Sequence, residues 1–114
     1  MYYIEADGTR EPAVKTRRSV KGVEFTTWGR DVTNCNIFEV EAGTTGYQGG
    51  DTGHGGRTYF RLEDAWGTDI SINIIKNGTR AQGVEIVLGG DTELSTFIEA
   101  LKWTVSVLEV QSVE

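Results

Sequence analysis

The chain contains 114 residues, of which 38% are hydrophobic and 25% charged, and its net charge is −6. This length fits a single domain, residues 1–114, with a modest core, and we expect a homo-oligomer because pairing buries more apolar surface. The negative charge repels duplex nucleic acid and anionic membranes, so neither is an expected partner without a local basic patch.

The N-terminal segment, residues 1–22, predicts an element at the edge of the fold. A short β-prone run ends at the turn signal Asp7-Gly8. The polar, basic stretch that follows fits two structures. It forms either a basic arm or an edge hairpin in which Val14 and Val20 point inward.

Three further strands are indicated by apolar residues near every second position. Residues 23–28 form the first of them, and we expect it to break at Gly29. Residues 36–42 form the second, with its apolar side chains on one face. Residues 58–63 form the third, after a long loop.

The cleanest alternation in the chain occurs at residues 69–75 and predicts one arm of a β-hairpin. The residues expected to face inward are Ile70, Ile72 and Ile74. Asn77-Gly78 is a hairpin turn signal, and residues 84–88 form the matching return strand.

Residues 91–110 predict one C-terminal helix, capped by Asp91 or Thr92 and with Glu93 in its first turn. The apolar residues that keep helical spacing are Leu94, Phe97, Ile98, Leu101, Val105 and Leu108. Residues 103–110 are also β-branched and alternating, so a shorter helix followed by a strand is an alternative. Together the elements predict an α+β fold, in which an antiparallel β-sheet of about five to six strands packs against one C-terminal helix.

The strongest functional signal is a glycine-rich loop at residues 43–57, since seven of the 15 glycines fall in its first 14 positions. Glycine permits positive φ angles and lets the backbone approach a ligand closely, and consecutive amides in such turns can form a nest for an anion. Arg57 and His54 add cationic groups. Tyr47 and Tyr59 offer flat surfaces on which a base can stack.

The loop therefore predicts a site for an anionic, nucleotide-like ligand, with phosphates on the amides and on Arg57 and the base on a tyrosine. Arg17 or Arg18 would extend the anion site. The candidate ligand-binding residues are Tyr47, Gly49, Gly50, Asp51, Thr52, Gly53, His54, Gly55, Gly56, Arg57 and Tyr59. We expect no cofactor and no metal, because Asp51 and His54 are too few ligands for a closed zinc site.

Two other roles for the loop remain open, since it can pack against a second subunit or be simply mobile. No Gly-Lys-Ser/Thr follows the glycines, which excludes a P-loop. Asp51-Thr52-Gly53 is similar to the active-site tripeptide of retroviral-type aspartic proteases but lacks the apolar residues before it. Neighbouring groups such as Asp51, Thr52 and His54 seldom hold catalytic geometry in a glycine loop, so we expect a protein that is not an enzyme.

Residues 44–59 and 87–101 resemble short uncharacterised proteins encoded by phages and prophages. The resemblance implies a host-takeover role, either as a binder that sequesters an immune signalling nucleotide or as an inhibitor of a host defence nuclease. It assigns no role to any residue. In the second case the chain would bind a protein through an acidic surface. The candidate residues of that surface are Glu39, Glu41, Glu63, Asp64 and Asp69.

The single cysteine, Cys35, excludes an internal disulfide and fits a reducing compartment. The N-terminal residues do not form a charged-then-apolar leader, and no apolar run approaches twenty residues. We therefore expect a cytoplasmic protein without a membrane partner.

Overall fold

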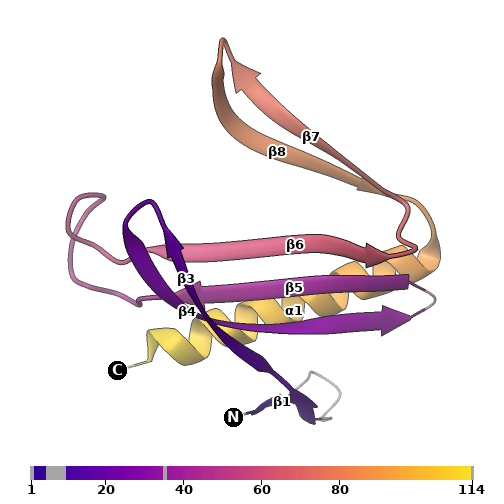
Figure 1. The fold of residues 1–114 in the computed structure, drawn as a ribbon, viewed down its shortest axis with the longest axis horizontal. Helices are drawn as coiled ribbons and strands as arrows, with labels where there is room; N and C mark the ends of the chain where they lie inside the picture. The colour runs from indigo at the N-terminus through magenta and orange to yellow at the C-terminus, as the bar shows by residue number, and fades with distance from the viewer. Residues whose placement is uncertain (1, 5–9, 35, 114) are drawn as a thin grey trace.

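The computed structural model describes residues 2–4, 10–34 and 36–113, which form an α+β fold of eight strands and one helix (Figure 1). The strands are β1 (Tyr2–Ile4), β2 (Arg10–Pro12), β3 (Val14–Val20), β4 (Val23–Asn34), β5 (Asn36–Thr44), β6 (Thr58–Trp66), β7 (Ile70–Asn77) and β8 (Arg80–Leu88), and the helix is α1 (Asp91–Ser112). The predicted class, antiparallel strands packed with one C-terminal helix, is confirmed. The Asp7-Gly8 turn and Cys35 lie outside the described residues.

Four strands form an antiparallel meander in the order β3-β4-β5-β6, and α1 lies across one face of it, against β5 and β4 (Figure 1). The core between the two layers is built from side chains at every second position of β4 and β5, which meet one side of the helix. Its buried members are Trp28, Val32, Phe38, Val40, Ala42, Ala100, Trp103 and Val107. The opposite face of the meander, which we call the open face, is not covered by α1.

Strand β4 passes through Gly29 and does not break there, contrary to the sequence prediction. A Cβ at this position would lie 3.0 Å from the carbonyl oxygen of Val40 on the neighbouring strand. Glycine thus allows a close approach inside the sheet rather than a turn. The edge-hairpin interpretation holds for β3, which pairs with β4, but Val14 and Val20 are exposed and do not point inward, because α1 packs on β5 and β4 and not on the edge strand β3.

Strands β7 and β8 form a separate two-stranded hairpin that projects from the end of the meander (Figure 1). Its turn is the predicted Asn77-Gly78, with Gly78 at a φ of 64°. The expectation that Ile72 and Ile74 face the core is wrong, because both are largely exposed and only Ile70, at the base, packs against the core. The alternation of apolar and polar residues correctly predicted a strand, but it did not indicate whether another layer covers the apolar face of that strand.

A single helix spans Asp91–Ser112, so residues 103–110 are helical and not a strand. The N-cap is Gly90, and neither predicted cap residue bonds the helix start through its side chain. Glu93 is buried, and its carboxylate accepts hydrogen bonds from the Thr92 hydroxyl (2.8 Å) and the Asp69 amide (3.4 Å), which ties α1 to the hairpin base.

The face of α1 that meets the sheet differs from the predicted apolar stripe. The residues that α1 buries are Glu93, Thr96, Ala100, Trp103, Thr104 and Val107. Most of the predicted stripe is exposed, namely Leu94, Ile98, Leu101 and Val105. The two sets are offset by about two residues, or about 200° around the helix, so they lie on opposite sides. Within the described part of the chain, no helix is long and apolar enough to cross a membrane.

Candidate functional site

The glycine-rich loop connects β5 to β6 and is closed by a hydrogen-bonded neck. The Thr45 amide donates to the Arg57 carbonyl at 3.0 Å, and the Arg57 amide donates to the Thr45 hydroxyl at 2.9 Å. Immediately before this pair, the hydroxyls of Thr44 and Thr58 lie 3.0 Å apart on the ends of the two strands. The loop therefore leaves the sheet from a defined base.

Asp51 organises the tip of the loop by accepting backbone hydrogen bonds. Its carboxylate accepts from the Gly53 amide at 2.9 Å, and its carbonyl accepts from the amides of His54 (3.2 Å) and Gly55 (2.6 Å). The hydrogen bond from Gly53, followed by that from His54, lowers the pKa of Asp51 below its usual value. Three amides that were predicted to bind an anion are thus occupied by the chain's own aspartate.

The Arg57 guanidinium is also directed at the loop itself. It donates to the carbonyl oxygens of Thr52 (2.5 Å), Gly55 (3.0 Å) and Gly56 (3.2 Å). Because these carbonyls surround the cation, the tip forms a self-contained turn. Its geometry does not favour phosphate binding between the tip amides and Arg57.

The first half of the loop, residues 46–50, has a different character. The amides of Tyr47, Gln48, Gly49 and Gly50 donate to no acceptor in the part of the chain that the structure describes. Gly46 and Gly49 take positive φ angles of 82° and 75°, which glycine adopts without strain. Four consecutive donors are therefore available to a partner from outside.

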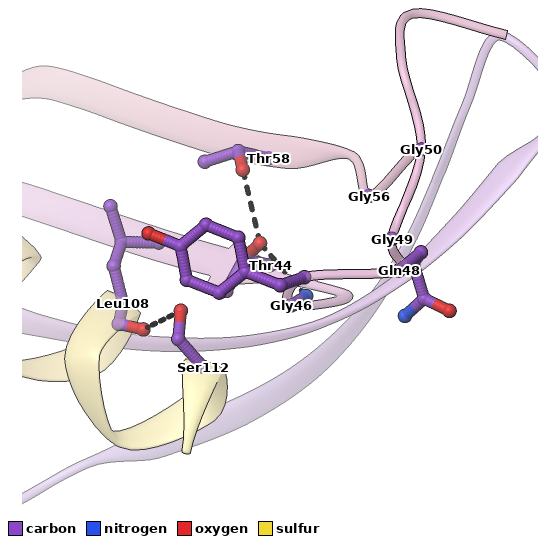
Figure 2. A pocket seen from close by; sticks show the side chains of 10 residues that line it. Thr44, Gly46, Gln48, Gly49, Gly50, Gly56, Thr58, Leu108 and Ser112 are labelled. Atoms are coloured by element: carbon purple, nitrogen blue, oxygen red, sulfur yellow. Dashed lines mark hydrogen bonds between the residues drawn. The ribbon is translucent and has the colours of Figure 1, made fainter. Parts of the chain in front are cut away.

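A hollow of about 580 Å³ lies between this segment, the ends of β5 and β6, and the last turn of α1 (Figure 2). Its lining residues are Thr44, Gly46, Tyr47, Gln48, Gly49, Gly50, Gly56, Thr58, Leu108 and Ser112. Figure 2 shows Thr44 and Thr58 on one side and Leu108 and Ser112, from the helix, on the other. Hydroxyls and backbone groups predominate, and Tyr47 adds a largely exposed ring.

The electrostatics of this hollow suit an uncharged ligand. No charged side chain lines it. The carbonyl end of α1, which carries the negative end of the helix dipole, lies beside it, and the last turn of the helix contains no basic residue to offset that charge. The residues that line the hollow bring unused loop amides and the carbonyl end of the helix near it, and these can serve a molecule that presents both acceptors and donors.

Gln111 anchors the helix end to the sheet where the hollow begins. Its side-chain oxygen accepts from the Thr44 amide at 2.8 Å, and its side-chain nitrogen donates to the Thr26 carbonyl at 2.9 Å. Gly43 is needed at the same place, since a Cβ there would lie 2.5 Å from that carbonyl oxygen. Sequence reasoning missed Gln111, Leu108 and Ser112, because nothing local signals that the helix end lies beside the loop.

The predicted site residues thus occupy three places. Those beside the hollow are Tyr47, Gly49, Gly50 and Gly56, and those of the tip are Asp51, Thr52, Gly53, His54, Gly55 and Arg57. Tyr59 lies on neither: it is on the open face, where its ring packs 5.8 Å from that of Phe25. The Nδ1 atom of His54 lies 3.4 Å from the Asp51 carboxylate at the exposed tip. Among the described residues, no three His, Cys, Asp or Glu side chains are placed to hold a metal ion.

The open face contains an ion pair that the sequence did not reveal. Arg18 donates two hydrogen bonds, at 2.6 and 2.7 Å, to the carboxylate of Glu41, which also accepts one from the Thr27 hydroxyl at 2.5 Å. Arg18 lowers the pKa of Glu41, and Glu41 raises that of Arg18. Arg18 is therefore bound within the sheet and not directed at the loop.

The predicted acidic surface is only partly assembled. Strand pairing places Glu39 opposite Glu63 on the open face, in the same row as Asp31, while Glu41 is paired with Arg18. Asp64 and Asp69 lie elsewhere, Asp64 accepting from the Thr68 amide at 3.2 Å.

The chain matches no protein-family model, no curated protein and no solved structure.

Proposed function

We propose that the chain is a non-enzymatic binding protein that holds the planar ring of a nucleotide-like ligand in the hollow beside residues 46–50. The observation that carries this proposal is the run of four unused amides, Tyr47 to Gly50, along a hollow of about 580 Å³. A hollow of this size lies within the range of small-molecule sites, and unused donors in the residues that line it favour a ligand rich in acceptors.

The lining residues suit a nucleobase and its sugar. Ring carbonyls and ring nitrogens accept from backbone amides. The hydroxyls of Thr44, Thr58 and Ser112 donate within the chain, so their oxygens accept from the hydroxyls of the sugar. Tyr47 supplies a face for stacking, a contact that contributes about 1–3 kcal/mol per base in other proteins. The carbonyl end of α1 accepts from the exocyclic amine of a base.

Phosphate groups would extend away from the hollow and contribute little. The tip amides are bonded to Asp51 and the Arg57 guanidinium to loop carbonyls, so neither is free to bind an anion. Affinity should consequently depend weakly on salt. A protein that binds a nucleotide without converting it would sequester that nucleotide, which is the role implied by the resemblance to phage-encoded proteins.

Amide NMR titrations with adenosine, guanosine and their 5′-monophosphates test the proposal. We expect shifts concentrated at Gly46, Gly49, Gly50 and Gly56, with nucleoside and nucleotide affinities within about tenfold of each other. Tyr47→Ala should weaken binding by about fivefold or more. His54→Ala, at the exposed tip, is the matched control and should leave the affinity unchanged.

Two results would contradict this function. One is the absence of any shift in residues 46–50 at millimolar concentrations of all four compounds. The other is binding that requires the phosphate and disappears in Arg57→Ala while Tyr47→Ala has no effect, which would return the site to the loop tip.

A further inference from the structure

The β7–β8 hairpin exposes an apolar surface that the described residues of its own chain leave uncovered. Strand pairing places Ile72 opposite Ile86 and Ile74 opposite Val84, so one face of the ribbon is aliphatic beyond its base. The exposed fractions of Ile72, Ile74 and Val84 lie between 52% and 60%. An isolated two-stranded hairpin is marginally stable in water, and an apolar face on it calls for a second layer.

The outer side of α1 is a second uncovered apolar surface. Leu94, Ile98, Leu101 and Val105 follow one another at intervals of four, three and four residues, and their exposed fractions lie between 42% and 57%. This spacing produces a continuous stripe along a helix, of the kind that packs against another element. Because the sheet meets the opposite side of α1, no layer formed by the described residues covers the stripe.

The hairpin cannot cover the helix of its own chain. It leaves the meander at the β6 end and lies apart from α1 (Figure 1). Its base is fixed there by the hydrogen bond from the Gly89 amide to the Asp69 carbonyl (3.0 Å) and by the bond from the Asp69 amide to Glu93. The two apolar surfaces are thus held apart within one molecule but are available to each other between two molecules.

We propose that the β7–β8 hairpin of each chain docks on the outer stripe of α1 in a second copy, so that two copies form a reciprocal dimer. The dimensions agree: strands of eight or nine residues extend roughly 27 Å, and the stripe from Leu94 to Val105 extends roughly 17 Å. One such contact buries an apolar patch on the order of 400 Å² on each side, which is below the roughly 800 Å² per partner of a stable interface. Two symmetric contacts reach that size, whereas one does not.

Charge also favours a second copy as the occupant. The hairpin carries Lys76 and Arg80 next to its turn and has a single acid, Glu85. The helix contains four acidic residues and one basic residue, Lys102, and no basic residue in its last turn. A basic ribbon therefore meets an acidic helix in a chain whose total charge is −6.

Analytical ultracentrifugation of the full chain between about 1 μM and 1 mM provides the test, with a concentration-dependent dimer as the expected result for the natural sequence. Ile74→Glu in the hairpin and Leu101→Glu in the stripe should each weaken dimerisation by about 100-fold or more, because each buries an unpaired charge. Matched controls are Ile75→Glu, on the other face of the hairpin, and Val110→Glu, outside the stripe. Both replace exposed residues and should dimerise like the natural chain.

Mixing the two disabled variants separates docking from a folding defect. The Ile74→Glu chain retains an intact stripe, and the Leu101→Glu chain retains an intact hairpin, so an equimolar mixture restores one of the two contacts. We expect a heterodimer weaker than the natural dimer but tighter than either variant alone. Three results would overturn the proposal. The natural chain stays monomeric at 1 mM, including the case in which it binds neutral lipid vesicles instead; the mixture associates no more at 1 mM than either variant alone; or the controls dissociate as much as the test variants.

Discussion

Removing either partner of the Arg18–Glu41 pair tests how the open face of the sheet is stabilised. The side chain of Glu41 is 7% exposed and that of Arg18 is 37% exposed. The charged group that each substitution leaves without its partner is therefore buried in one case and partly hydrated in the other. Arg18→Ala leaves a buried carboxylate with one hydrogen bond, from the Thr27 hydroxyl, and with the charge of Arg61, which lies opposite Glu41 on β6. Glu41→Ala leaves a guanidinium that reaches water, and a Thr27 hydroxyl that still donates to the Thr16 carbonyl at 3.3 Å.

The expected loss of unfolding free energy depends on how buried the remaining charged group is. An uncompensated buried charge costs up to about 3–5 kcal/mol, and we expect about 3 kcal/mol for Arg18→Ala because the carboxylate retains one hydrogen bond and the nearby charge of Arg61. For Glu41→Ala we expect about 2 kcal/mol, since Arg18 regains hydration. At roughly 4 °C per kcal/mol, the melting temperatures should fall by about 12 °C and about 8 °C.

The pH dependence provides a second reading of the same pair. Because folding lowers the pKa of Glu41, its contribution to stability is complete above the unfolded pKa, about 4.3, and is lost as the pH falls through the folded pKa. Glu41→Gln removes this titration while keeping the side-chain volume. The stability difference between the natural chain and Glu41→Gln should therefore be largest near pH 7 and shrink below about pH 4.3.

Urea unfolding of the two alanine variants and of the double variant at pH 7 measures the coupling. We expect the double variant to lose about 1.5–3 kcal/mol less unfolding free energy than the sum of the losses in the two single variants. The reasoning is refuted if Glu41→Ala is the more damaging substitution, or if the coupling is below about 0.5 kcal/mol. Either result would mean that the pair is hydrated and contributes as little as a surface ion pair.

Two further predictions concern the base of the loop. Gln111→Ala should cost about 1–2 kcal/mol in urea unfolding and speed amide exchange at Thr44, because the amide of Thr44 and the carbonyl of Thr26 lose their partner. Gly43→Ala should cost about 2 kcal/mol or more, because its Cβ would lie 2.5 Å from the Thr26 carbonyl oxygen. Gly53→Ala is the control, with its nearest contact at 3.5 Å, and should stay within about 0.5 kcal/mol; equal losses for the two glycines would contradict the close approach at Gly43.

Features of the fold that depend on neighbouring residues in the sequence were predicted correctly, whereas features that depend on contacts with other strands were not. Asn77-Gly78 was identified as a turn because a positive φ at the glycine is a local requirement, and the structure has it. Gly29 was misjudged because its role depends on the Val40 carbonyl of the neighbouring strand. A glycine in a strand pattern is consistent with a break or with a close approach, and only the pairing decides between them.

The faces of the elements were harder to predict than the elements themselves. Leu101 is exposed while Thr96 and Thr104 are buried, against the expectation from hydrophobicity. The hydroxyls of both threonines donate hydrogen bonds to carbonyl oxygens of the preceding helical turn. Thr96 also accepts a hydrogen bond from the Asn36 side chain at 3.1 Å. A polar residue that pairs inside the helix can be buried at little cost, and periodicity alone cannot show this.

The loop was located from its glycines, but the bonding of its tip amides and of Arg57 to the loop itself was not foreseen. Asp51 followed two residues later by Gly53 is a local signal for an aspartate that bonds its own backbone, so the filling of the tip amides had a sequence signature. The contribution of Leu108 and Ser112 had none. It depends on the length of α1 and on the direction in which the helix crosses the sheet.

The helix connects the two proposals. A helix has more surface than one sheet can cover, and α1 is apolar on more than the side that it buries. Its C-terminal end completes the hollow through Leu108 and Ser112, while its outer stripe from Leu94 to Val105 has no covering layer among the described residues. A core made by one helix on one meander is small for a chain of 114 residues, so leaving that stripe and the hairpin in water would sacrifice apolar burial that the fold needs. In the proposed dimer, the exposed apolar residues that sequence reasoning assigned to the core of one chain would be core residues of a two-chain assembly.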